Sequence, residues 1–373
     1  MRSALVALVL PFAFAVALAA QTGGSIVEFP VNYPNQTSMQ TGACHPKPGG
    51  STHEITFNMK GGGTFWVTGQ NYGQVVEVAQ SGAMVFHPMP EKSGPHGIEF
   101  DSQGRLWVTL EFAGQVVRLD GNGKIVQTID VGLACPTCAK GETLNPSPHG
   151  MGFDAADNLW FTGKKSGTIG RISPDGKITT FPLATVGSVP IYIRVANDGK
   201  TMWATELVGN AIARITADGT VTEFPIPTNN SRPIAIVPEP GGSNMWFTEE
   251  AGNRVAKIDP NGIITEYPLP LGQASSILAG LGFDSAGNLW VQQYVDQNNP
   301  TPANPSPAGA DYVIRIDKSI LEAAPSDLSQ VPITYYKTPS TQTVMHRILQ
   351  GPDGNIWFTE LGVNKVGKLF LGK

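Results

Sequence analysis

The chain has 373 residues, of which 43 are glycine and 30 are proline, with 41% hydrophobic residues and a formal net charge of -5. It is too apolar and too weakly charged to be intrinsically disordered, and its many glycines and prolines are typical of a turn-rich all-β protein. The acidic balance argues against a nucleic-acid partner, and no basic run indicates binding to an anionic membrane. We therefore expect a monomer that binds a small molecule and uses no nucleotide cofactor.

Residues 1–20 resemble a signal peptide. Arg2 is followed by the apolar run Ala4 to Ala17, and Ala17-Leu18-Ala19 or the following Ala20 offers a cleavage site with small residues. A membrane anchor is the alternative, but the run is short, and no later segment approaches the ~20 apolar residues of a transmembrane helix. We expect a secreted protein in which residues 21–373 form a single domain.

Two features of the following chain fit export. Asn35 and Asn229 begin glycosylation sequons. The three cysteines, Cys44, Cys135 and Cys138, cannot all pair with one another. A redox or metal pair at Cys135 and Cys138 is the alternative to one disulfide with a leftover thiol, which we favour in an exported protein, with Cys44 bonded to Cys135 or Cys138.

The seven tryptophans mark an internal repeat. They are Trp66, Trp107, Trp160, Trp203, Trp246, Trp290 and Trp357. Most are about 43 residues apart, and each lies in a near-copy of one phrase, as in Asn158-Leu-Trp-Phe-Thr162 and Asn355-Ile-Trp-Phe-Thr359. Each unit reads as four short strands, A to D, joined by turns, with the tryptophan in strand B. This is the period of a propeller blade, whereas the rungs of a β-solenoid are shorter, so we predict a seven-bladed β-propeller.

The last unit lacks a fourth strand. Its strands A to C fall near 346–350, 356–359 and 366–371, and then the chain ends. The segment Ser25 to Pro30 belongs to no unit of its own and matches the strand D segment Val221 to Pro225. We expect it to complete blade seven, because this would close the ring and remove an exposed sheet edge.

Four of the six histidines occupy one position of the repeat, at the start of strand A: His53, His96, His149 and His346. Counting back from each tryptophan places Tyr192, Ile234 and Ala279 at this position in blades four, five and six. Packing between blades is the simplest role for one histidine, but a fold that accepts Ile and Ala there does not need four. Since strand A lines the channel of a propeller, we predict a shared site at its mouth, where histidine can bind a metal or transfer protons.

Several acidic residues lie near this arc. Glu206, Glu249 and Glu360 end strand B and are followed four residues later by Asn210, Asn253 and Asn364. A Glu–Asn pair that recurs in three blades is better explained by turn stabilisation than by catalysis. Glu99 and Glu111 lie in the blade of His96, and together with Tyr192 and Glu360 they are candidate substrate-binding residues. Long loops precede His53, His149 and His346, which indicates a covered mouth.

The phrases that build the blades resemble the virginiamycin B lyase (streptogramin lyase) family. They are Pro95-His-Gly-Ile98 with Gly104-Arg-Leu-Trp107, Gly351-Pro-Asp-Gly-Asn-Ile-Trp-Phe-Thr-Glu360, and Val221-Thr-Glu-Phe-Pro-Ile-Pro227. The resemblance spans all seven repeats. It implies a seven-bladed propeller that opens a cyclic depsipeptide by β-elimination, with Mg²⁺ held by carboxylates and a histidine base on neighbouring blades.

The family's two successive histidines match His53 with His96, or His96 with His149. The acid two residues before the second histidine is Gly94 or Ser147 here, and the glutamate that ends strand B of that blade is Leu110 or Gly163. The carboxylate-rich magnesium set is thus not reproduced. If His53, His96, His149 and His346 hold a divalent metal, imidazole ligands favour a softer transition ion than Mg²⁺.

Three functions remain open at this point. We favour a lyase-like or lactonase-like enzyme in which one of the four histidines assists elimination or hydrolysis of a small cyclic ester, lactone or related natural product. A non-catalytic binding module for a carbohydrate, peptide or protein is the first alternative. A cyclase of natural-product biosynthesis is the second.

Overall fold

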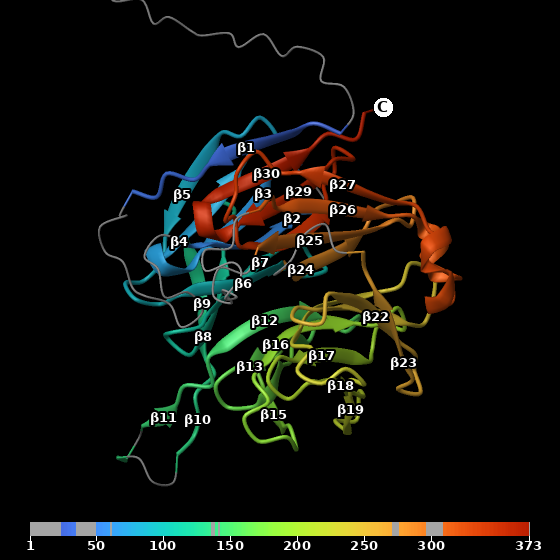
Figure 1. Ribbon diagram of the computed structural model, residues 1–373. Helices are drawn as coiled ribbons and strands as arrows, with labels where there is room; N and C mark the ends of the chain where they lie inside the picture. The colour runs from blue at the N-terminus through green and yellow to red at the C-terminus, as the bar shows by residue number, and fades with distance from the viewer. Residues whose placement is uncertain are drawn as a thin grey trace, which may run out of the picture.

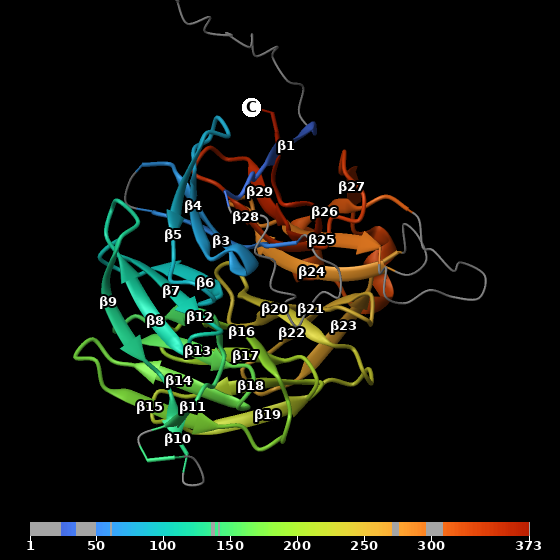
Figure 2. The same ribbon diagram turned by 90° about the vertical axis from the view of Figure 1, so that its left-hand side faces the viewer.

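The computed structural model describes residues 24–34, 50–59, 62–135, 139–140, 142–270, 276–295 and 309–372. Within them, seven four-stranded antiparallel sheets follow one another around an axis (Figures 1 and 2). This confirms the predicted seven-bladed propeller. No helix in these ranges is long and apolar enough to cross a membrane.

Blades one to three are formed in chain order. Blade one contains β2 (Thr52–Phe57), β3 (Phe65–Gly69), β4 (Gln74–Val78) and β5 (Met84–Pro88). Blade two contains β6 (Pro95–Phe100), β7 (Leu106–Leu110), β8 (Gln115–Leu119) and β9 (Ile125–Asp130). Blade three contains β12 (Pro148–Phe153), β13 (Leu159–Gly163), β14 (Thr168–Ile172) and β15 (Ile178–Pro182).

Blades four to six repeat the pattern. Blade four contains β16 (Pro190–Val195), β17 (Met202–Glu206), β18 (Ala211–Ile215) and β19 (Val221–Pro225). Blade five contains β20 (Pro233–Pro238), β21 (Met245–Glu249), β22 (Arg254–Ile258) and β23 (Ile264–Pro268). Blade six contains β24 (Ser276–Phe283), β25 (Leu289–Val295), β26 (Tyr312–Ile316) and β27 (Ile333–Lys337).

Blade seven joins the two ends of the described chain. It contains β28 (Met345–Gln350), β29 (Ile356–Glu360) and β30 (Lys365–Leu369), and its outer strand is β1 (Ile26–Pro30). β1 pairs antiparallel with β30 from Ile26 opposite Leu369 to Pro30 opposite Lys365. The predicted closure by the N-terminal strand is therefore confirmed.

In the described part of the chain, four short 3₁₀ helices and one small hairpin lie in the connections between strands. The helices are η1 (Gln70–Tyr72), η2 (Lys318–Leu321), η3 (Pro325–Gln330) and η4 (Leu361–Val363). The hairpin of β10 (Leu133–Ala134) and β11 (Thr143–Leu144) lies in the long loop before blade three and projects from the body of the propeller (Figure 1).

The tryptophans anchor the cores between the sheets. Trp160 is fully buried and stacks on Phe181 of strand D, with ring centroids 5.5 Å apart. Its indole N–H donates to Asp154 at the A-to-B turn, at 2.9 Å. The indole N–H groups of Trp107, Trp246, Trp290 and Trp357 likewise donate to a carboxylate of the A-to-B turn. In these five blades one ring packs the core while its polar edge is satisfied by a turn carboxylate.

Strand A of each blade contacts strand A of both neighbouring blades, so that these seven strands form a closed inner ring. Figure 2 shows the fourth strands β5, β9, β15, β19 and β23 at the periphery. The side chains of strand A that do not pack in a blade core therefore face the propeller axis.

Candidate functional site in the inner ring

The histidines occupy a β-bulge. In blade three the register shifts between Pro148 and Met151, so that His149 and Gly150 both lie opposite the single residue Thr162. Strand A of each of the other six blades has the same shift. A bulge re-aims its side chains, and this lets two consecutive residues reach the same neighbours.

A belt of threonines fixes the bulges to one another. Thr162 Oγ1 accepts a hydrogen bond from Gly150 N at 2.9 Å and donates one to Ile191 O of the next blade at 3.1 Å. Equivalent pairs of bonds are made by Thr68, Thr109, Thr205, Thr248 and Thr359. In blade six the amide group of Gln292 takes this role. The belt explains the threonine of the repeated Trp-Phe-Thr phrase, which the sequence analysis left without a role.

The bulge register corrects one assignment. Pro190 pairs with Glu206, and Ile191 O accepts from the belt residue of blade three, so Ile191 occupies the histidine position in blade four. Tyr192, which counting from the tryptophan placed there, is the second residue of the bulge. The A-to-B turn is one residue longer in blade four than in blade three, which shifts a count made backwards from the tryptophan.

The structure brings the four predicted histidines together. The ring centroids of His96 and His149 are 3.5 Å apart, those of His53 and His96 are 4.9 Å apart, and those of His53 and His346 are also 4.9 Å apart. His53, His96 and His149 are 3%, 1% and 2% exposed, whereas the side chain of His346 is 19% exposed. The cluster thus lies inside the inner ring, and His346 is its most accessible member.

A glutamate that the sequence analysis did not identify lies beside this cluster. Glu54 Oε1 is 3.3 Å from His346 Nε2 and 4.0 Å from His96 Nδ1, and Glu54 Oε2 accepts from Arg347 Nε at 2.6 Å. Burial alone would raise the pKa of Glu54, but Arg347 and His346 lower it below its ordinary value. Glu54 is therefore a buried carboxylate held ionised between an arginine and a histidine.

The same surroundings keep the imidazoles neutral. Burial, together with the neighbouring rings, holds the pKa of His96 well below its ordinary value. Burial and Lys164 do the same for His149. For His346, burial and Arg347 lower the pKa, and Glu54 opposes them in part. These rings can therefore accept a proton or bind a metal at neutral pH.

Glu111, which was predicted near the arc, lies on the other side of the cluster. Its Oε2 accepts from Gln70 Nε2 at 2.5 Å, and its Oε1 is 3.2 Å from Lys164 Nζ. Burial raises its pKa, although Lys164 and Gln70 oppose this. Ligand atoms of His96, His149 and Glu111 lie within 4.8 Å of one another.

Glu99 and Tyr192 belong to a second polar layer of the inner ring. Glu99 Oε1 accepts from Thr56 Oγ1 at 3.0 Å, and its Oε2 is 3.4 Å from Arg194 Nη2. Arg194 also donates to the Tyr192 hydroxyl. The guanidinium carbons of Arg194 and Arg347 lie 4.2 and 4.0 Å from the Tyr192 ring centroid. Tyr192 thus links the charges of this layer to Arg347 and hence to Glu54.

Glu360 has different surroundings from the histidine cluster. Burial and the neighbouring Glu28 of β1 raise its pKa to about 9. Glu206 and Glu249 face strand D glutamates in the same way, and their pKa values are raised to about 7 and about 8. These three carboxylates make no hydrogen bond to the described residues. The expected Glu–Asn pair is therefore not formed by the side chains, and the asparagine side chains support the turn. Asn210, Asn253 and Asn364 have φ angles of 53°, 50° and 51°, and the Asn210 side chain donates to Thr228 O at 2.9 Å.

The cluster fits a transition metal better than Mg²⁺. Ligand atoms of His53, His96 and His346 lie within 4.8 Å of one another, and Glu54 Oε1 is adjacent. His96 Nδ1 is buried and makes no hydrogen bond to any residue of the described ranges. Three imidazole ligands suit an ion such as Zn²⁺, whereas Mg²⁺ prefers a cage of oxygen ligands.

The remaining predicted features lie at the periphery or outside the described ranges. Residues 1–20, Asn35, Cys44 and Cys138 lie outside them. Cys135, next to β10, is disulfide-bonded. Asn229 is exposed in the loop before blade five.

Comparisons with known proteins agree with this architecture. The model of the Virginiamycin B lyase family matches residues 60–298. The virginiamycin B lyase of Nocardia farcinica (strain IFM 10152) is 32% identical over 139 residues, which are 37% of this chain and 45% of that protein. The chain thus aligns with slightly less than half the length of this relative.

Two solved structures are similar over the whole propeller. The virginiamycin B lyase of Staphylococcus aureus has a TM-score of 0.71 and 26% identity, covering 93% of this chain and 100% of that chain. A catalytically inactive variant of the Staphylococcus aureus enzyme with Quinupristin has a TM-score of 0.70 and 26% identity, with the same coverage. Because the family model matches more than half of its length, this chain belongs to the virginiamycin B lyase family.

Proposed function

We propose that this chain is an exported enzyme that opens a small cyclic ester, lactone or related natural product, with His346 as the general base. The observation that carries the proposal is the pair of His346 and Glu54, in which the most accessible imidazole of the cluster lies 3.3 Å from a buried carboxylate. The leader-like residues 1–20 support export. The Staphylococcus aureus relative with Quinupristin supports a cyclic depsipeptide as the first substrate to test.

The pair can prepare a base in the required tautomer. His346 Nε2 faces Glu54 Oε1 at 3.3 Å, and when this nitrogen carries the proton, the lone pair of Nδ1 remains free to accept another. Arg347 holds Glu54 in place at 2.6 Å, so the carboxylate orients the ring and stabilises the imidazolium that forms. This is the arrangement of a histidine base with an orienting acid.

In an elimination, His346 would take the proton from the carbon next to a carbonyl group. The electron pair of that C–H bond then forms a C=C bond, the ester C–O bond breaks, and the ester leaves as a carboxylate. In a hydrolysis, the same base would take a proton from water as the water attacks the ester carbonyl. Arg347 Nη2, buried and without a hydrogen bond to the described residues, supplies a donor for the oxygen that gains charge.

A metal-dependent form is the second candidate, and the burial of three histidines favours it. His53, His96 and His346 would hold a transition ion, which when bound would act as a Lewis acid on the ester carbonyl. His346 would then be a ligand, which leaves His149 as the base. His149 Nδ1 lies 3.0 Å from Ile191 O, so its Nε2 is the unprotonated nitrogen. If the chain binds a metal at this site but catalyses no reaction, it is the non-catalytic binding module.

The test combines product mass with metal content. Purified chain is incubated with quinupristin and with a panel of lactones, before and after treatment with a chelator, and elemental analysis is done in parallel. Elimination gives a linear product of unchanged mass, and hydrolysis adds one water.

His346→Ala should abolish turnover with an unchanged melting temperature, because Ala279 occupies the same bulge position in blade six. Glu91→Gln, at an exposed acid outside the cluster, is the control. Bound metal without turnover would favour the binding module, and turnover by the His346 variant would refute the proposed base.

A further inference from the structure

A second candidate site lies between blades one and two, where the repeat changes the sign of one charge. In six blades the residue of strand C that pairs with the tryptophan is an arginine or a lysine. These residues are Arg118, Arg171, Arg214, Lys257, Arg315 and Lys368. In blade one the partner of Trp66 is Glu77.

In blade four this cation lies beside the aromatic rings of its own blade and bonds to the next blade. The guanidinium carbon of Arg214 lies 5.9 Å from the ring centroid of Trp203 and 5.2 Å from that of Phe224. Its Nη1 donates to Pro260 O of the next blade at 2.5 Å. Arg214 and Trp203 line a cavity of about 280 Å³ between blades four and five. The chain thus supplies a cation to the cavity between these blades.

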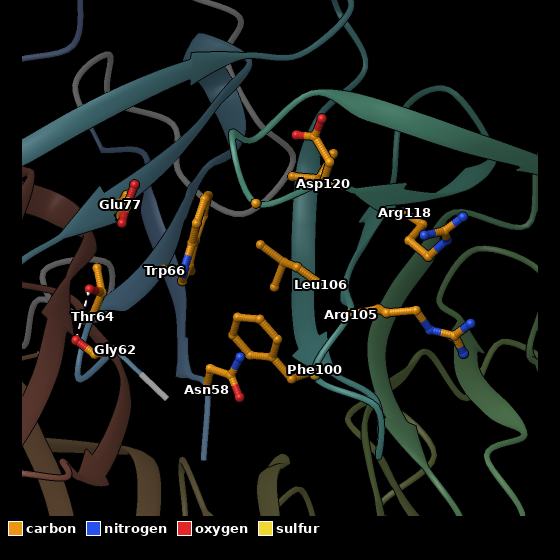
Figure 3. A pocket seen from close by; sticks show the side chains of 13 residues that line it. Asn58, Gly62, Thr64, Trp66, Glu77, Phe100, Arg105, Leu106, Arg118 and Asp120 are labelled. Carbon is orange, nitrogen blue, oxygen red and sulfur yellow. Dashed lines mark hydrogen bonds between the residues drawn. The ribbon is translucent and has the colours of Figure 1, made fainter. Parts of the chain in front are cut away.

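Blade one has the corresponding cavity, but its strand C carries Glu77 where the other blades carry a cation. A cavity of about 340 Å³ between blades one and two is lined by Trp66 and Glu77, together with Asn58, Thr64, Phe100 and Asp120 (Figure 3). His87 takes the place of the strand D aromatic and stacks on Trp66 at 5.1 Å. Its Nε2 is 3.7 Å from Glu77 Oε2, which is within ion-pair distance when the ring is protonated but too long for a hydrogen bond.

The two arginines that border the cavity do not neutralise Glu77. Arg105 Nε donates to Asp101 at 2.6 Å, and Arg118 Nε donates to Gln127 at 3.1 Å. Figure 3 shows both guanidinium groups pointing away from Glu77. Asp120 adds a second negative charge to the cavity wall, although its Oδ1 also accepts from the backbone of its own turn.

We propose that this cavity binds a small organic cation, a guanidinium or alkylammonium group, in the place that Arg214 occupies between blades four and five. The ligand's charge would lie against the Glu77 carboxylate and beside the ring of Trp66, both of which line the cavity. Both contacts favour a cation, because a carboxylate attracts it directly and an aromatic face attracts it through its quadrupole. The site is separate from the histidine cluster and does not depend on the proposed enzymatic activity.

The test uses two ligands of the same shape and different charge. Binding of butylguanidinium and of the neutral butylurea to the intact chain is compared by ligand-observed NMR titration. We expect butylguanidinium to bind at least about tenfold more tightly. Equal affinity of the two ligands would refute the proposal.

Variants then assign the binding to Glu77. Glu77→Gln should weaken butylguanidinium binding by about tenfold, and Glu77→Arg should abolish it by placing the chain's own cation there. The Arg variant should keep the wild-type melting temperature, since six blades already carry arginine or lysine at this position; if it does not fold, the Gln variant decides. Glu91→Gln, at an exposed acid outside the cavity, should bind as wild type, and unchanged binding by Glu77→Gln would overturn the assignment.

Discussion

The threonine belt makes a quantitative prediction for stability. Thr162 is fully buried, and its hydroxyl satisfies Gly150 N at 2.9 Å and Ile191 O at 3.1 Å. Thr162→Val replaces the hydroxyl with a methyl group of similar size. It leaves Gly150 N buried without a partner, whereas Ile191 O keeps its contact with His149 Nδ1 at 3.0 Å. Since an unsatisfied buried N–H costs about 1–3 kcal/mol, we expect the free energy of unfolding to fall by about 1–3 kcal/mol.

Thr162→Ser is the matched control. It keeps the hydroxyl and loses only a methyl group, which costs about 1 kcal/mol. Urea unfolding followed by tryptophan fluorescence should therefore place the midpoint of the valine variant below that of the serine variant. If valine is as stable as serine at this position, the hydroxyl does not join the blades, and the belt is only a consequence of packing.

Three further outcomes follow from other parts of the chain. Deletion of Gly24–Pro30 should lower the melting temperature, because blade seven loses its outer strand; an unchanged cooperative melt would contradict this closure. Burial and Glu28 raise the pKa of Glu360 to about 9 in the folded chain, so the stability from this group is full below about pH 4.5 and is lost as the pH rises through 9. Thermal melts should show this loss in the wild type and less of it in Glu360→Gln. Mass spectrometry of a non-reduced digest should find Cys135 joined to one of the other two cysteines, and three free thiols would be the contrary result.

The blade count and the closure were predictable because each blade repeats its own turn and core chemistry. The tryptophan period and the turn residues of each unit define the four strands without any long-range information. The match of Ser25 to Pro30 with Val221 to Pro225 was sufficient to place the closing strand. Convergence of four histidines from blades seven, one, two and three followed from their common position in a ring.

The chemistry around the histidines was less predictable, since it depends on contacts between blades distant in sequence. Glu54 and Arg347 each occur once at their repeat position and are far apart in the chain, so no repetition marks their pair. A signal was nevertheless present, because Glu54 directly follows His53 and Arg347 directly follows His346. This adjacency predicts a shared site only once the bulge is known, since a regular strand would direct consecutive side chains to opposite faces.

The second residue of the bulge divides the inner ring into two kinds of surface. A Cβ added to Gly97 would lie 2.4 Å from His149 O, and one added to Gly150 would lie 2.4 Å from Ile191 O. Glycine therefore lets strands A approach closely where the rings of His96 and His149 meet at 3.5 Å. Where the second residue instead carries a long side chain, as at Glu54 and Arg347, the same position supplies the charges that orient His346. One irregularity of the backbone, repeated in every blade, thus provides both the close packing and the polar contacts of the candidate site.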